Sequence, residues 1–208
     1  MVAIVDYGVG NLFSLKSSFK AIGAEVVITA EKEVLESADR ILLPGVGAFE
    51  DAAKKLRESG LHDVLKQLVA EGKPLMGICL GMQLLFEKSY EYGCHEGLGL
   101  IKGSVRPISD VAPADYKIPH IGWNALIFKQ SSPLFKYIND GDCVYFVHSY
   151  YAAECENEVI ATTEYGAEIT AAVAHKNVFG CQFHPEKSGE AGLNILKAFV
   201  EMEACDLC

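Results

Sequence analysis

The sequence predicts an α/β fold: a mostly parallel central sheet with helices on both faces, plus antiparallel strands in the second half. In the first hundred residues, short apolar segments alternate with stretches of helical periodicity, which is the pattern of βαβ units. After about residue 98, short strands are separated by turn residues, which is typical of antiparallel pairing. The 208 residues contain no repeat, linker or low-complexity stretch, so residues 1–208 are expected to form one domain.

The first half is expected to form four strands and four helices. Asn11 is placed to cap the first helix, and Gly23 is placed to end it. The expected strands are 2–6, 24–28, 40–43 and 74–78, and the expected helices are 12–22, 47–59, 61–70 and 80–88.

The second half is expected to consist mainly of strands. Turns are predicted at 139–141, which reads Asn-Asp-Gly, and at 165–166. A final helix over 189–202 carries Leu193, Leu196, Phe199 and Val200 on one face. The expected strands are 98–101, 124–128, 143–147, 158–163, 169–174 and 178–183.

Composition limits the classes of function. The formal net charge is −10, which argues against nucleic acid or an anionic membrane as the main partner. No apolar run approaches the length of a membrane span and no signal segment precedes the first strand, so the protein is expected to be cytoplasmic. The seven cysteines follow no disulfide spacing and are expected to be free thiols. Cys205 and Cys208 form a C-x-x-C at the extreme end, which we interpret as tail composition without a redox role.

The segment 77–81, GICLG, is the most informative in the chain. Cys79 stands where an expected strand turns directly into a helix, a position that strains the backbone and presents the side chain to the crevice at the strand ends. The helix N-terminus favours a thiolate, and the amide of Leu80 is placed to stabilise an oxyanion. A cysteine can also be a small core residue, but the glycines two positions before and after Cys79 favour a nucleophile.

A thiol nucleophile needs a base and an orienting group. His184 follows an expected strand, and Pro185 fixes the backbone between it and Glu186. Glu186 can accept a hydrogen bond from His184 and so set its tautomer. His148 is the alternative base. The order Cys, His, acid differs from that of the α/β-hydrolases and disfavours an ordinary esterase.

No cofactor or metal is expected. Gly8-Val9-Gly10 begins like a dinucleotide-binding fingerprint, but Phe13 stands where the third glycine is required. Cys181 and His184 lie three residues apart, but no second ligand pair with zinc spacing accompanies them.

Five segments together resemble the class I (triad) glutamine amidotransferases. The resemblance covers nearly the whole chain and is closest to the glutaminase subunits of imidazole glycerol phosphate synthases. It implies that Cys79 attacks the side-chain amide of glutamine and that His184 passes the thiol proton to the leaving ammonia. The segments are 6–12 (DYGVGNL), 44–47 (PGVG), 77–83 (GICLGMQ), 119–124 (PHIGWN) and 180–189 (GCQFHPEKSG).

The resemblance also implies roles for residues around the nucleophile. Val46 and Gly47 would complete the oxyanion site with Leu80, and the two glycines beside Val46 would allow its peptide to flip. Gln83 lies one helical turn after Cys79 and could reach the substrate. The remaining substrate contacts would come from Glu91, for the ammonium group, and from Ser149 and Tyr150, for the carboxylate; alternatively, Glu91 is a solvated carboxylate at a helix end.

The implied partner is a cyclase subunit with a (β/α)8 barrel, which forms a heterodimer with the glutaminase. His120, Trp123 and Asn124 would lie at the interface, with Trp123 as an anchor; the alternative is that Trp123 is a core residue. A related subunit could instead serve pyridoxal phosphate synthesis or surface-sugar amidination. A chain that only scaffolds a partner is a further alternative, disfavoured by the intact Cys79, His184 and Glu186.

Overall fold

The computed structural model describes residues 1–203 and has an eight-stranded main sheet. The five strands from β2 to β14 run parallel, and the last three are joined antiparallel. This is the α/β fold that the sequence predicts. In spatial order the strands are β2 (Val26–Thr29), β1 (Val2–Val5), β3 (Arg40–Leu43), β4 (Leu75–Ile78), β14 (Val178–Cys181), β13 (Glu168–His175), β12 (Val159–Glu164) and β9 (Ile127–Phe128).

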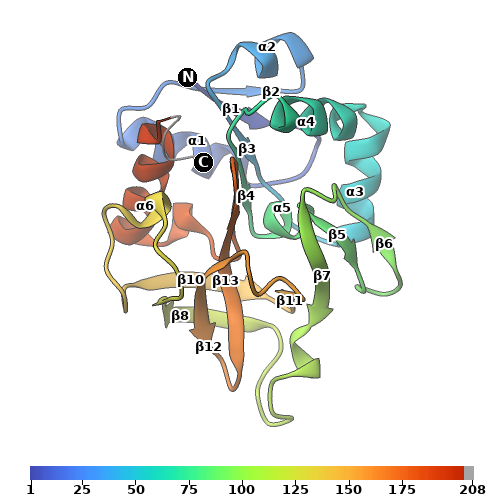
Figure 1. Cartoon of the computed structure of the whole chain (residues 1–208), viewed down its shortest axis with the longest axis vertical. Helices are drawn as coiled ribbons and strands as arrows, with labels where there is room; N and C mark the ends of the chain where they lie inside the picture. Colours follow the sequence, from blue (N-terminus) through green and yellow to red (C-terminus); the bar gives the residue numbers. More distant parts are fainter. Residues whose placement is uncertain (204–208) are drawn as a thin grey trace.

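Helices cover both faces of the parallel strands. Successive side chains of a strand point to opposite faces, so Val2 and Ile4 enter one apolar core while Ala3 and Val5 enter the other. The first core is completed by α1 (Leu12–Ala21) and α6 (Gly189–Glu201), which contact each other on one side of the sheet (Figure 1). The second core is completed by α2 (Lys32–Ser37), α3 (Phe49–Glu58) and α4 (Leu61–Ala70).

Two smaller sheets flank the C-terminal ends of the parallel strands. One pairs β8 (His120–Ala125) with β10 (Cys143–His148) in antiparallel register, with His120 opposite His148. The other has the order β11-β7-β5-β6, in which β5 and β7 are parallel. Its strands are β5 (Phe86–Ser89), β6 (His95–Glu96), β7 (Ile101–Pro107) and β11 (Tyr150–Ala153), and three 3₁₀ turns lie at η1 (Ile108–Asp110), η2 (Pro133–Phe135) and η3 (Pro185–Lys187).

Several predicted elements are wrong in length or kind. The helix expected over 80–88 is only α5 (Leu80–Gln83), because the chain then pairs with β7 as strand β5. In β5, Phe86 and Ser89 are buried and Glu87 is exposed, a pattern that a single turn of helix and a short strand share. The strand expected over 98–101 begins only at Ile101, and α2 and β11 were not predicted.

Details at the helix ends also differ from expectation. Asn11 occupies the N-cap position of α1, but its side chain makes no capping hydrogen bond. In α6, Leu196 and Phe199 are buried as predicted, whereas Leu193 and Val200 are only half-buried. Cys205 and Cys208 lie outside the described residues. No helix among residues 1–203 is long and apolar enough to cross a membrane.

Candidate active site

Cys79 stands in a strained turn between β4 and α5. Its φ of 55° is a left-handed value that residues with a side chain rarely adopt. The turn is held by a hydrogen bond of 2.7 Å from the Cys79 amide to the carbonyl of Cys181 on β14. It also requires glycines at two positions: a Cβ on Gly77 would lie 2.6 Å from the Gly81 carbonyl oxygen, and one on Gly81 would lie 1.9 Å from that of Leu43. The strand, turn and helix therefore fix the thiol at the sheet edge.

His184 and Glu186 are brought together at the end of β14. The His184 Nδ1 donates to Glu186 Oε1 at 2.9 Å, and both side chains are buried. The backbone of His184 is anchored by its amide, which donates to the carbonyl of Tyr145 at 2.9 Å. Ser188 adds a second anchor, because its hydroxyl donates to the His184 carbonyl at 2.7 Å and accepts from the Tyr145 amide at 2.9 Å.

The electrostatics of His184 follow from this arrangement. Burial alone lowers the pKa of an imidazole, but hydrogen bonds and charge interactions with Cys79 and Glu186 outweigh it and raise the pKa of His184 to about 9. Since Nδ1 is engaged by Glu186, Nε2 is the nitrogen that remains for Cys79. At neutral pH His184 therefore carries a proton and faces Cys79, as required of a group that protonates a leaving amine.

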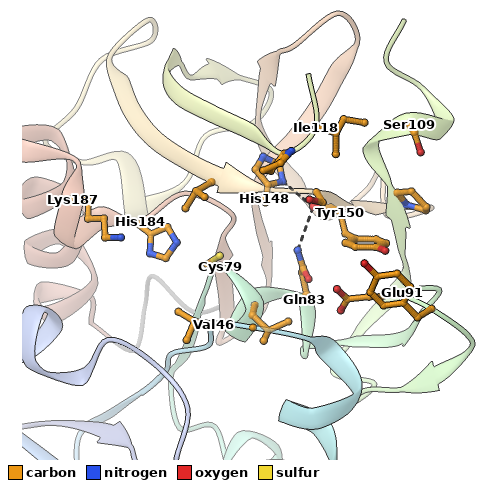
Figure 2. A pocket seen from close by; sticks show the side chains of 17 residues that line it. Val46, Cys79, Gln83, Glu91, Ser109, Ile118, His148, Tyr150, His184 and Lys187 are labelled. Atoms are coloured by element: carbon orange, nitrogen blue, oxygen red, sulfur yellow. Dashed lines mark hydrogen bonds between the residues drawn. The ribbon is translucent and has the colours of Figure 1, made fainter. Parts of the chain in front are cut away.

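A pocket of about 570 Å³ opens above Cys79 (Figure 2). It lies at the C-terminal ends of the parallel strands, where open α/β sheets bind ligands. Figure 2 shows His184 and Val46 beside Cys79, with Gln83, Glu91 and Tyr150 farther along the pocket. Of the residues predicted to form the active site, only the buried Glu186 does not line it; the others are Val46, Gly47, Cys79, Leu80, Gln83, Glu91, Ser149, Tyr150 and His184.

Gln83 and Glu91 make contacts that the sequence did not indicate. The Gln83 side chain is buried and its Nε2 donates to the Tyr150 carbonyl at 3.2 Å and to Gln182 Oε1 at 3.0 Å. Glu91 Oε2 accepts from the amide of Phe49 at 2.5 Å, at the start of α3. Glu91 follows strand β5 instead of ending a helix of its own, and it is half-buried, so it is not a solvated carboxylate at a helix end. Its other oxygen remains available toward the pocket.

The structure argues against His148 as the base. His148 also lines the pocket, but its Nδ1 contacts the Tyr150 carbonyl at 2.8 Å and its Nε2 contacts His120 at 3.0 Å. Neither nitrogen is left for Cys79. Burial, with a smaller effect of the neighbouring histidines, also lowers the pKa of His148 to about 3, despite the hydrogen bond to Tyr150.

The segment 119–124 presents its large apolar side chains to solvent and its polar side chains to the other face of β8. Trp123 is 55% exposed and Ile121 is 58% exposed, so Trp123 is not a core residue. His120 points the other way and is 0% exposed. The expectation that His120 contacts a partner is therefore wrong for its side chain, because alternate residues of strand β8 face opposite sides. Asn124 is half-buried beside it.

Comparison with known proteins agrees with this geometry. Residues 3–202 match the family Glutamine amidotransferase class-I. The chain belongs to the class I glutamine amidotransferases. Its relatives include the imidazole glycerol phosphate synthase subunit HisH of Caldanaerobacter subterraneus, 50% identical over 99% of this chain and 100% of the relative. The subunit of the same name from Lactococcus lactis is 49% identical over 96% of this chain and 98% of its own length.

Solved structures support the class I amidotransferase fold. A crystal structure titled glutamine amidotransferase superimposes with a TM-score of 0.75 at 22% identity, covering 96% of this chain and all of the other. PurLQS from Thermotoga maritima superimposes with a TM-score of 0.73 at 22% identity, covering 96% of each chain.

Two residues of this amidotransferase site lie in the segment 180–189, but the sequence did not indicate a role for either. Ser188, which follows η3 directly, holds the backbone of His184 through a contact that is visible only in the folded chain. Gln182 approaches Cys79, with 3.8 Å between Nε2 and Sγ, and also binds Gln83. Within residues 1–203, no group of three or more His, Cys, Asp or Glu side chains is placed to hold a metal ion.

Proposed function

We propose that the chain is the glutaminase subunit of an imidazole glycerol phosphate synthase, which hydrolyses glutamine and supplies ammonia to a cyclase subunit in histidine biosynthesis. The observation that carries the proposal is that Cys79 and His184 line one pocket, with Glu186 hydrogen-bonded to His184 behind it, in a chain of this family. The two HisH relatives, matched over nearly their full lengths, support the specific pathway. A single amidotransferase domain over residues 1–208 is part of the proposal.

The chemistry proceeds through a thioester. The Cys79 sulfur attacks the side-chain carboxamide carbon of glutamine, and the thiol proton resides on His184. The C–N bond then breaks, and His184 gives this proton to the departing nitrogen, which leaves as ammonia. Water hydrolyses the glutamyl thioester to glutamate and restores the thiol. Glu186 keeps Nδ1 of His184 protonated and stabilises the imidazolium.

Backbone amides stabilise the oxyanion of each step. The Leu80 amide opens helix α5 directly after the nucleophile, and the Val46–Gly47 peptide lines the same pocket. Loss of one oxyanion donor costs roughly 10²–10³ in rate. Gly47 has a φ of 90°, which glycine tolerates because it has no side chain. The Val46–Gly47 peptide can therefore rotate without a steric clash at Gly47. The orientation of this peptide is the element through which a partner could control the rate.

Glutamine recognition uses the other end of the pocket. Glu91 would bind the substrate ammonium group through its remaining oxygen. The backbone of Ser149 and Tyr150 would bind the carboxylate, and Gln83 supports that segment through the Tyr150 carbonyl. The pocket of about 570 Å³ is large enough for an amino acid and open to solvent on the side of Val46, which is 44% exposed.

The partner is proposed to be a cyclase with a (β/α)8 barrel, bound as a heterodimer. Trp123 and Ile121 give the protein an exposed apolar surface on β8, and Trp is enriched in interface hot spots. Asn124 lies on the same strand. A cytoplasmic location is also proposed, which the free thiols of five described cysteines support.

Glutamate release with and without the cyclase tests the proposal. The isolated chain is expected to hydrolyse glutamine slowly, and the cyclase with its nucleotide substrate should accelerate it at least about 10²-fold, the effect of one restored oxyanion donor. A subunit of pyridoxal phosphate synthase serves as the control partner and should have no effect. Acceleration by the control partner, or none by the cyclase, would contradict the proposed pathway.

A further inference from the structure

A line of four groups, with two buried histidines at its centre, connects strand β8 to the substrate pocket. Asn124 Oδ1 lies 2.8 Å from His120 Nε2, and His120 Nδ1 lies 3.0 Å from His148 Nε2. His148 Nδ1 lies 2.8 Å from the Tyr150 carbonyl oxygen. Gln83 donates to the same oxygen, and Figure 2 shows the contacts of His148 and Gln83 converging on Tyr150.

Both ends of this line accept hydrogen bonds. The Tyr150 carbonyl is an acceptor by its chemistry. Asn124 presents its oxygen to His120 because its Nδ2 donates to the carbonyl of Glu164 at 3.1 Å, and turning the amide over would place two oxygens against each other. Three hydrogen bonds therefore need three protons, whereas two neutral imidazoles supply two. One contact in the line lacks a proton unless the pair becomes cationic.

The surroundings disfavour the cation. His120 is stacked between the rings of Phe146 and Tyr165, with centroids 4.9 Å and 3.9 Å away. The titratable groups that face the pair are Tyr165 on His120 and the protonated His184, whose positive charge acts on His148. Burial lowers the pKa of both members of the pair. The hydrogen bond to Asn124 partly offsets this for His120, and the hydrogen bond to the Tyr150 carbonyl partly offsets it for His148.

We propose that His120 is a positioning residue for glutamine binding, and that Asn124 selects through it whether His148 donates to the Tyr150 carbonyl. If neutral His120 donates its one N–H to Asn124, its Nδ1 becomes an acceptor. His148 can then donate from Nε2 to His120, and its Nδ1 no longer donates to the Tyr150 carbonyl. If His120 instead donates from Nδ1 to His148, then His148 donates from Nδ1 to the Tyr150 carbonyl. That carbonyl then has two donors, His148 and Gln83, which fix the position of the segment 148–150. The inference rests on the proposed function, because this segment is proposed to bind glutamine.

The acceptor at position 124 provides the test. Asn124→Leu removes the acceptor, so only the contacts from His120 to His148 and from His148 to Tyr150 remain. The two protons of the neutral pair satisfy both, and KM for glutamine should equal or fall below that of the unchanged protein. In Asn124→Asp the carboxylate favours the extra proton on the pair. Its second oxygen also replaces the donor to the Glu164 carbonyl, so the comparison rests on the pH dependence of KM within this variant and not on its absolute value. The ratio of its KM to that of the unchanged protein should therefore rise about 5-fold from pH 5.5 to pH 8, the effect of one neutral hydrogen bond. Values of kcat should change less than KM.

The assays use the full chain with saturating cyclase, so that a weaker complex does not alter the result. Imidazole ¹⁵N shifts of the same variants report the protonation of the pair without any turnover. A KM ratio for Asn124→Asp that is flat from pH 5.5 to 8, or a pair that gains no proton, would overturn the inference. Absence of glutamine hydrolysis by the unchanged complex would instead overturn the proposed function, and the ¹⁵N spectra would still test the pair.

Discussion

His184 illustrates how single contacts set the chemistry of the site. Its backbone is held at both polar groups, by Tyr145 and Ser188, and its Nδ1 is held by Glu186. The ring therefore has one orientation, with Nε2 directed to Cys79. Its pKa of about 9 depends on both Cys79 and Glu186, because burial by itself acts in the opposite direction.

Replacing Cys79 by alanine should therefore lower the pKa of His184. The change removes one hydrogen bond and one charge interaction that favour the imidazolium, while the opposing burial remains. An NMR titration of His184 in both proteins measures it, and the exposed His175 provides the control signal, which should not move. An unchanged or higher pKa of His184 in Cys79→Ala would show that Cys79 does not raise it and would contradict this account.

At the level of elements, the close contact of α5 with β3 and β4 positions the nucleophile. Gly81 does not have a positive φ, so its requirement for glycine is purely one of space: its Cα faces the Leu43 carbonyl. Gly23 is the opposite case, with a φ of 77° and nothing within 4 Å of an added Cβ. A substitution at Gly81 therefore tests the cost of crowding, and one at Gly23 tests the cost of backbone strain.

Gly81→Ala should lower the free energy of unfolding by at least about 3 kcal/mol, the upper end of the usual cost of overpacking, because backbone rather than a flexible side chain must move. Gly23→Ala should cost about 1–2 kcal/mol, the strain of a left-handed residue. Denaturant titrations of the two variants and the unchanged chain provide the comparison. Equal losses at the two positions would contradict the account of the turn.

Elements with a strong local pattern were predictable from the sequence. Helix Leu61–Ala70 and strand Arg40–Leu43 match the prediction to the residue. The helix has a clear apolar period, and the strand is a short apolar run bounded by Asp39 and Pro44. Strand β5 was predicted as helix, since its pairing with β7 is a long-range contact that no local pattern records. For the same reason the sequence indicated Cys79 and His184 through their motifs but not the hydrogen bond by which Ser188 holds the His184 backbone.

The pairing of two histidines could not be derived from the sequence either. His120 and His148 are 28 positions apart, and they meet because β8 and β10 pair in a register that sets them opposite each other. Each was predicted in a different role, one at a partner surface and the other as a possible base. Their burial against each other excludes both of these roles for their side chains.

At the scale of the whole molecule, the parallel sheet carries the nucleophile and the two smaller sheets close the pocket above it. β14 brings His184 next to β4, and the turn between β10 and β11 supplies Ser149 at the opposite wall. The exposed Trp123 and Ile121 lie on β8, which is hydrogen-bonded to β10. A partner bound to β8 would therefore contact the neighbour of β10, the strand that leads directly into the substrate pocket.

In the proposed function, Cys79 releases ammonia from glutamine for a second enzyme. The most direct test measures synthase product from the complex of the cyclase with Cys79→Ala, using either glutamine or an ammonium salt as the nitrogen source. With glutamine, the rate should fall on the order of 10³-fold or more, as for loss of a triad nucleophile. With ammonium, it should match that of the unchanged complex, because the cyclase performs the later steps. Glutamine-dependent synthesis that survives at more than a few per cent would contradict the claim.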